Sequence, residues 1–146
     1  MTYLKLTEED AALQLVRRQR MRESLIGFAQ NIDIPGAPVK DDQSLEEFDI
    51  LMAQGGSIET GLAAHHILLM HKLQACMEKR YGRLMVFMPP GGAKSTYCSV
   101  VAPTWYMGNN PGAQIILASY GTDLAKKHGA KGRIIVQQPN FMDAFD

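Results

Sequence analysis

The chain has 146 residues, of which 46% are apolar and 21% charged, and its 15 basic and 15 acidic side chains leave no net charge. These values are typical of one globular domain and exclude an intrinsically disordered chain. Zero net charge gives no support for nonspecific DNA binding, which depends on neutralising phosphates. No apolar run approaches the roughly 20 residues that span a bilayer, and the N-terminus lacks a signal-peptide core. Cys76 and Cys98 have no metal or redox spacing, so we expect reduced thiols in a soluble cytoplasmic protein without membrane contact.

A helical N-terminal region is predicted for residues 1–60. Thr7 can cap a helix that begins at the acidic residues after it and continues, with apolar residues at helical spacing, to about Gln30. Arginines lie between those apolar residues, and we interpret them as the solvated face of the helix in preference to contacts with a phosphate backbone. They are Arg17, Arg18, Arg20 and Arg22.

A linker is predicted after this helix. Proline and glycine between Ile34 and Pro38 break the helical pattern and polar residues follow, so residues 31–44 are read as a connecting segment. A short helix over residues 45–54 and a turn at residues 55–57 are expected to complete the N-terminal region.

A clearer helix is predicted from Leu62 to about Lys79, because apolar residues recur along it at helical spacing and Gly82 follows as a stop signal. It carries three histidines, His65, His66 and His71. A helical zinc pair needs ligands three or four positions apart, whereas His71 lies five and six positions from the other two. We therefore do not predict a metal site from these histidines.

The most informative segment, which we call the glycine loop, runs from Met88 to Thr96 and reads Met-Pro-Pro-Gly-Gly-Ala-Lys-Ser-Thr. An apolar run over residues 84–88 indicates a strand before it, and residues 95–106 can form a helix after it. Backbone N–H groups in such a loop, with the positive end of a helix dipole, bind phosphate oxygens. Lys94 would reach the β- and γ-phosphates, and the Ser95 hydroxyl would ligate Mg²⁺. The candidate nucleotide-binding residues are Gly91, Gly92, Ala93, Lys94, Ser95 and Thr96.

The glycine loop departs from the common phosphate-loop pattern G-x-x-x-x-G-K-[ST]. With Lys94 in register, the two required glycines fall on Met88 and Ala93. Because alanine does not comfortably adopt positive φ, we expect Gly91 and Gly92 to make the tight turn. An ordinary proline-glycine turn is the alternative interpretation of this segment.

The residues after the glycine loop predict a helix that Pro103 kinks or ends, and then a turn over residues 108–112. Residues 114–119 read as a buried strand, and Thr122 or Asp123 can cap a helix that continues to about Val136. Strand, loop, helix, strand and helix in this order predict an α/β fold. Its core would be an incomplete parallel βαβ arrangement, like that of P-loop NTPases, in residues 61–146.

Motifs on both sides of the glycine loop extend its pattern. Two prolines lead into Ala-Lys-Ser at residues 89–95, and the pair His65-His66 opens the helix upstream. Downstream, residues 102–111 and 118–125 continue the series. In order and spacing, residues 60–146 resemble the large subunits of tailed-phage DNA-packaging terminases, in the branch whose phosphate loop (Walker A) ends in Ala-Lys-Ser.

This resemblance implies an ATPase that binds ATP and Mg²⁺ and couples hydrolysis to the packaging of double-stranded viral DNA in a bacterial host cytoplasm. It also implies a portal and a small terminase subunit as partners, and a homo-oligomer. Residues 80–83 lie where the family's adenine-side motif falls, although packing and surface charge explain them equally well. Gly91 replaces an arginine that often follows the two prolines, which leaves Arg133 as a candidate for that role.

The resemblance also implies parts that do not appear by Asp146. An acidic pair after an apolar strand (Walker B) and a nuclease domain would lie further on, so we expect the N-terminal portion of a longer protein, or a split or decayed gene product. Two other functions stay open. One is a catalytically incomplete module for nucleotide binding or assembly, and the other is an unrelated P-loop enzyme such as a small-molecule kinase.

Overall fold

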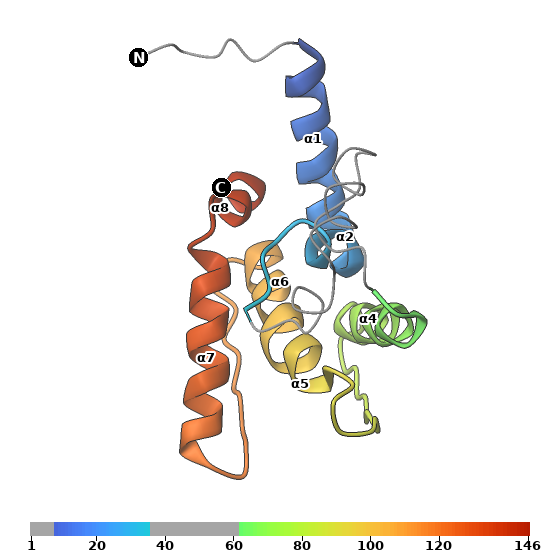
Figure 1. The fold of residues 1–146 in the computed structure, drawn as a ribbon, viewed down its shortest axis with the longest axis vertical. Coiled ribbons are helices and arrows are strands. Elements are labelled where there is room, and N and C mark those ends of the chain that lie inside the picture. The colour runs from blue at the N-terminus through green and yellow to red at the C-terminus, as the bar shows by residue number, and fades with distance from the viewer. Residues whose placement is uncertain (1–7, 36–61) are drawn as a thin grey trace, which may run out of the picture.

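The computed structural model describes residues 8–35 and 62–146, and every regular element in these two segments is a helix (Figure 1). The elements are α1 (Glu8–Glu23), α2 (Leu25–Ala29), α4 (Ala64–Met77), α5 (Lys94–Thr96), the π-helix η2 (Tyr97–Val101), α6 (Ala102–Asn109), α7 (Thr122–Val136) and α8 (Pro139–Phe145). Both segments contribute to one apolar core, in which Phe28 of α2 packs edge-on against Phe141 and Phe145 of α8. None of the described helices combines the length and apolar character that a membrane crossing requires.

Some predictions fall outside the described residues. These are the cap at Thr7, the short helix at residues 45–54, the turn at residues 55–57 and most of the linker. The division of the chain at residue 60 therefore stays a prediction. The first linker residues are only partly solvated, because Ile32 and Ile34 are buried in the core while Asp33 is exposed.

The predicted α/β fold with a parallel βαβ core is wrong for the described residues, which contain no strand. Residues 84–88 and 114–119, for which the sequence predicts strands, are irregular chain. A strand requires a neighbouring strand about 4.8 Å away to complete its backbone hydrogen bonds. In Figure 1 the helix that follows the glycine loop lies between the two segments, and no ladder joins them. Their side chains also differ from buried strands, since Phe87 is 83% exposed and Ile116 is 94% exposed.

The predicted N-terminal helix is present, but it is divided at Ser24 into α1 and α2. Ser24 has an extended backbone (φ −133°, ψ 127°), and its hydroxyl accepts a hydrogen bond from the Gly27 N–H at 3.2 Å, which caps α2. The Leu25 N–H, which a continuous helix would direct at the Met21 carbonyl, donates instead to Gln74 Oε1 of α4 at 2.9 Å. The break therefore fixes α2 against α4 and leaves the Met21 carbonyl available to another donor.

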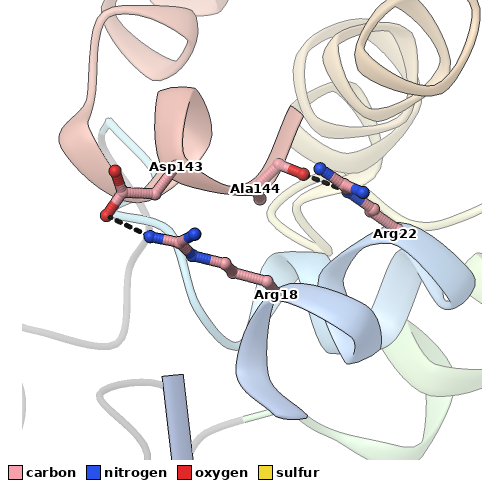
Figure 2. A network of polar contacts seen from close by, with 4 residues as sticks. All are labelled: Arg18, Arg22, Asp143 and Ala144. Atoms are coloured by element: carbon pink, nitrogen blue, oxygen red, sulfur yellow. Dashed lines mark hydrogen bonds and ion pairs between the residues drawn. The ribbon is translucent and has the colours of Figure 1, made fainter. Parts of the chain in front are cut away.

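The four arginines of α1 bind groups of this chain, so the prediction of a merely solvated face is incomplete. The partners are Asn31 for Arg17, Asp143 for Arg18, Gln30 for Arg20 and the Ala144 carbonyl for Arg22. Figure 2 shows Arg18 and Arg22 reaching α8 from neighbouring turns of α1. These side chains fasten α1 to the turn after α2 and to the C-terminal helix.

The helix after the glycine loop is continuous through α5, η2 and α6, and it does not end at Pro103. The chain widens into a π turn just before the proline, and the Ala102 N–H donates to the Tyr97 carbonyl. The Thr104 hydroxyl lies 2.8 and 2.9 Å from the carbonyl oxygens three and four positions earlier. The wider turn and this hydroxyl supply hydrogen bonds around the position where proline has no N–H to give, so the helix accommodates it.

The remaining local predictions agree with the structure more closely. The helix from Leu62 is α4, and the chain turns sharply at Gly82, where a Cβ would lie 1.9 Å from the Cys76 carbonyl oxygen. The turn predicted over residues 108–112 is present only at residues 110–112, because α6 continues to Asn109, and Gly112 has φ 86°. The last long helix is α7, but its N-cap is Gly121, without a side-chain cap, instead of Thr122 or Asp123.

Candidate functional site

The glycine loop forms an open pocket of about 410 Å³ that is lined by its own residues, from Met88 to Thr96. Pockets of about 300–1,000 Å³ commonly bind small molecules. The candidate nucleotide-binding residues all contribute to this one concave surface. They are Gly91, Gly92, Ala93, Lys94, Ser95 and Thr96.

The tight turn of the loop is made by Gly91 (φ 85°) and Ala93 (φ 53°, ψ 17°). The expectation that Gly92 replaces Ala93 in this role is wrong, since Gly92 has no positive φ. A left-handed conformation costs a non-glycine residue about 1–2 kcal/mol. Ala93 is held in it because the methyl group packs against the core and the carbonyl accepts the first helical hydrogen bond, from the Tyr97 N–H at 3.2 Å.

The loop leads directly into the first turn of the helix formed by α5, η2 and α6. Because the first helical hydrogen bond runs from Tyr97 to Ala93, the N–H groups of Lys94, Ser95 and Thr96 precede the helical ladder. These three residues also line the cavity. Backbone N–H groups at the positive end of a helix attract anions, so the cavity has the electrostatic character that phosphate oxygens require.

Lys94 lines the cavity. Its positive charge also affects the pKa of Cys98, which lies one helical turn further along. Burial raises the pKa of the Cys98 thiol, and the nearby Lys94 ammonium opposes this rise. Since burial is the larger effect, Cys98 remains a protonated thiol at neutral pH and is not an activated nucleophile.

His66 of α4 lies close to the residue that follows the glycine loop, Tyr97. Its ring centroid is 4.8 Å from that of Tyr97 and 4.0 Å from that of His65. Burial lowers the pKa of His66, the His65 charge lowers it further, and the Gly92 backbone opposes the change. His66 therefore brings α4 into contact with the helix that follows the loop, at Tyr97.

A second cavity of about 500 Å³ borders the glycine loop and is mostly apolar. Met88, Pro89 and Gly92 form its boundary with the loop, and the opposite wall comes from α4. The α4 residues are His65, Leu68, Leu69 and Lys72. An apolar or planar group can be held here directly beside a charged group in the loop.

The residues proposed for the adenine side do not line either of these two cavities. Arg80, whose guanidinium lies 5.2 Å from the centre of the Tyr81 ring, lines a separate cavity of about 370 Å³. This third cavity also brings together Cys76 and Cys98, both as free thiols. Arg133 lies on α7 with its side chain exposed and lines none of the three.

Sequence reasoning considered His66 as a metal ligand and as part of the motif that opens the upstream helix, and it missed the contact with Tyr97. The sequence does contain a signal that His66 is buried. It shares one face of α4 with residues 70, 73 and 77, which recur at helical spacing and pack toward the core. Residues 8–35 and 62–146 contain no group of three or more His, Cys, Asp or Glu side chains that could hold a metal ion.

Comparison of the chain with protein-family models, curated proteins and solved structures finds no match. The terminase resemblance therefore rests on the order of short motifs, and the assignment of function rests on the geometry of the glycine loop.

Proposed function

We propose that the chain is the nucleotide-binding portion of a phage terminase large subunit, and that its glycine loop holds the phosphates of ATP. The observation that carries this proposal is the cavity of about 410 Å³, which the loop lines by itself at the start of a helix. Backbone N–H groups that precede the helical ladder are suited to phosphate oxygens. Lys94 adds a full positive charge for the β- and γ-phosphates.

The residues of the loop also fit Mg²⁺ as an ion shared with ATP. The Ser95 hydroxyl is an oxygen ligand, the type that Mg²⁺ prefers, and the cavity lining contains no carboxylate. Mg²⁺ keeps several waters and takes further ligands from substrate phosphates, and the loop would contribute one hydroxyl to its coordination. When bound, the ion neutralises charge on the β- and γ-phosphate oxygens.

The cellular role follows from the motif order around the loop. In this proposal, ATP hydrolysis by the whole protein drives double-stranded viral DNA into a capsid in the host cytoplasm. Its partners are the portal, the small terminase subunit and further copies of the same chain. The near-balance of acidic and basic residues adds no support for DNA contact, so nucleotide binding is the part to test first.

Nucleotide binding can be measured with the fluorescent analogue mant-ATP in the presence of Mg²⁺. We expect wild-type protein to bind, and Lys94→Ala to bind roughly 10–100-fold more weakly, the usual effect of losing a charged contact. Lys127→Ala is the matched control, because it removes an exposed lysine from α7 without touching the loop. Ser95→Ala should retain weak binding but lose its dependence on Mg²⁺.

Phosphate release and phosphate transfer then test the alternatives. These 146 residues lack the acidic pair that ATP hydrolysis requires, so binding without release is expected both for the terminase portion and for a catalytically incomplete nucleotide-binding or assembly module. Release by these residues would overturn the absence of that pair, and phosphate transfer to a small acceptor would support a kinase. Absence of mant-ATP binding by the wild-type chain would contradict the proposal itself.

A further inference from the structure

Among the described residues, both ring nitrogens of buried His66 and one ring nitrogen of half-buried His128 lack a hydrogen-bond partner. Buried Thr104 differs from them. The Thr104 hydroxyl is hydrogen-bonded to carbonyl oxygens of its own helix. The His66 side chain belongs to a residue that is only 7% exposed, and neither ring nitrogen makes a hydrogen bond of ordinary geometry. Buried polar groups are normally hydrogen-bonded, so these nitrogens call for a functional explanation.

The surroundings of the ring identify the acceptor that is available to it. Burial favours the neutral imidazole, which carries one N–H donor. The Gly92 N–H already donates to the Pro89 carbonyl at 3.3 Å, so the backbone group that Gly92 can offer the ring is its carbonyl oxygen. The raising effect of the Gly92 backbone on the pKa of His66 agrees with an acceptor. The hydrogen bond from His66 to the Gly92 carbonyl is not formed in the structure, so it requires a movement of the loop or the ring.

Both neighbours of the ring beyond α4 lie close to the residues that line the candidate site. Gly92 is in the wall of the cavity, two positions before Lys94, and Tyr97 stands at the end of the first helical turn, two positions after Ser95. An apolar side chain would fill this part of the core without the cost of burying two unpaired ring nitrogens. A hydrogen-bond donor at this position can instead fix the path of the loop backbone.

We propose that His66 is a positioning residue of the glycine loop, whose ring rests on Tyr97 and donates a hydrogen bond to the Gly92 carbonyl to hold the loop in the conformation that receives phosphate. This proposal rests on the proposed function, because it concerns the same site. In this role His66 acts from α4 on the backbone of the loop and does not contact the nucleotide.

The test uses mant-ATP with Mg²⁺ and the full 146-residue chain. His66→Phe keeps a ring against Tyr97 but removes both nitrogens, and we expect its dissociation constant to rise about tenfold. His66→Asn or His66→Gln returns an N–H near one of the two nitrogen positions, and one of them should restore binding to within about threefold of wild type. The matched control is His71→Phe, an exposed position on the same helix, which should bind like wild type.

Thermal unfolding of each variant separates positioning from folding. A weaker dissociation constant for folded His66→Phe, with rescue by one amide variant, supports the proposal. Folded His66→Phe that binds as tightly as wild type overturns it and leaves the proposed function intact, whereas a wild-type chain that does not bind overturns the proposed function.

If His66→Phe does not fold, the ring nitrogens of wild-type His66 are followed by ¹⁵N NMR as mant-ATP is added. A ring nitrogen that becomes a hydrogen-bonded N–H when the Gly92 amide signal shifts supports the proposal. Ring nitrogens that stay unchanged while the Gly92 signal shifts overturn it.

Discussion

The indole N–H of Trp105 donates a 2.9 Å hydrogen bond to the backbone carbonyl of Met21, and so joins the helix that follows the glycine loop to the N-terminal helix α1. This carbonyl is free to accept because Ser24 divides α1 from α2 and the Leu25 N–H turns to Gln74. Met21 and Trp105 are both buried. The N-terminal helices therefore support the helix on which the candidate site is built.

Trp105→Phe should lower the free energy of unfolding by about 1–3 kcal/mol, because it leaves the buried Met21 carbonyl without a partner and reduces packing. Urea unfolding followed by circular dichroism measures the change. Tyr120→Phe, at an exposed aromatic position, is the control and should stay within about 0.5 kcal/mol of wild type. Equal stability of the two variants would show that the indole bond contributes nothing.

A glycine in α6 gives a second test of how the helices pack. A Cβ at Gly108 would lie 2.8 Å from the Phe145 ring, so Gly108→Ala should destabilise the protein by about 1–3 kcal/mol through overpacking. Gly129→Ala in α7 is the matched control. Apart from its chain neighbours and the backbone of its own helix, no atom lies within 4 Å of its Cβ position, so alanine there should stabilise by up to about 1 kcal/mol through helix propensity. Both effects are measured by thermal unfolding.

The contact explanation for Gly108 is checked with a second substitution. Phe145→Leu removes part of the ring that the new methyl group would strike, so the double variant should recover much of the stability that Gly108→Ala loses. Additive losses in the double variant would mean that Gly108→Ala acts elsewhere.

The sequence predicts the parts of this fold that depend on local chemistry. Helical periodicity is sufficient for α4 and α7, and glycine with proline is sufficient for the turn after α6. The strand predictions at residues 84–88 and 114–119 fail for a physical reason. β-propensity describes how a side chain fits a sheet, whereas a strand also needs a partner backbone, which depends on the tertiary arrangement.

The candidate site was predictable as a segment but not in its internal geometry. The residues of the glycine loop line one cavity, as their pattern indicates. The left-handed conformation of Ala93 was not predictable, because it depends on packing and on the first hydrogen bond of the next helix. The contact of His66 with Tyr97 joins residues from separate helices, so helical spacing alone could show only that His66 lies on a buried face.

Ala93→Gly tests the conformation of the loop directly. Glycine relieves a left-handed cost of about 1–2 kcal/mol but increases the entropy of the unfolded chain, so the net change should lie between zero and a stabilisation of about 1 kcal/mol. Ala125→Gly in α7 is the contrasting control, and it should destabilise by about 1 kcal/mol because that alanine is in a right-handed helix. Similar losses in both variants, measured by urea unfolding, would contradict the left-handed assignment.

The two arginines that reach α8 should differ in their contribution to stability (Figure 2). Arg18 and Asp143 are 3.6 Å apart with side chains 41% and 61% exposed to solvent, so Arg18→Ala should cost less than about 0.5 kcal/mol. Arg22 donates to the carbonyl of Ala144, a fully buried residue, so Arg22→Ala should cost about 1–3 kcal/mol. Thermal unfolding at low and high salt compares them, and an equal loss in both variants would contradict the difference.

The buried imidazole of His66 makes stability depend on pH. Burial lowers the pKa of His66 below its ordinary value of 6.5, so the unfolded chain binds a proton more readily than the folded chain. The groups that face the ring are His65 on α4, the Gly92 backbone and the Tyr97 ring on η2. The stabilising effect of the neutral ring is complete well above pH 6.5 and is lost as the pH falls from 6.5 toward the lower folded pKa, by at most about 1.4 kcal/mol per pH unit. Urea unfolding between pH 8 and pH 5 should show a smaller loss in His66→Phe than in the control His71→Phe, and parallel curves for the two variants would exclude this titration.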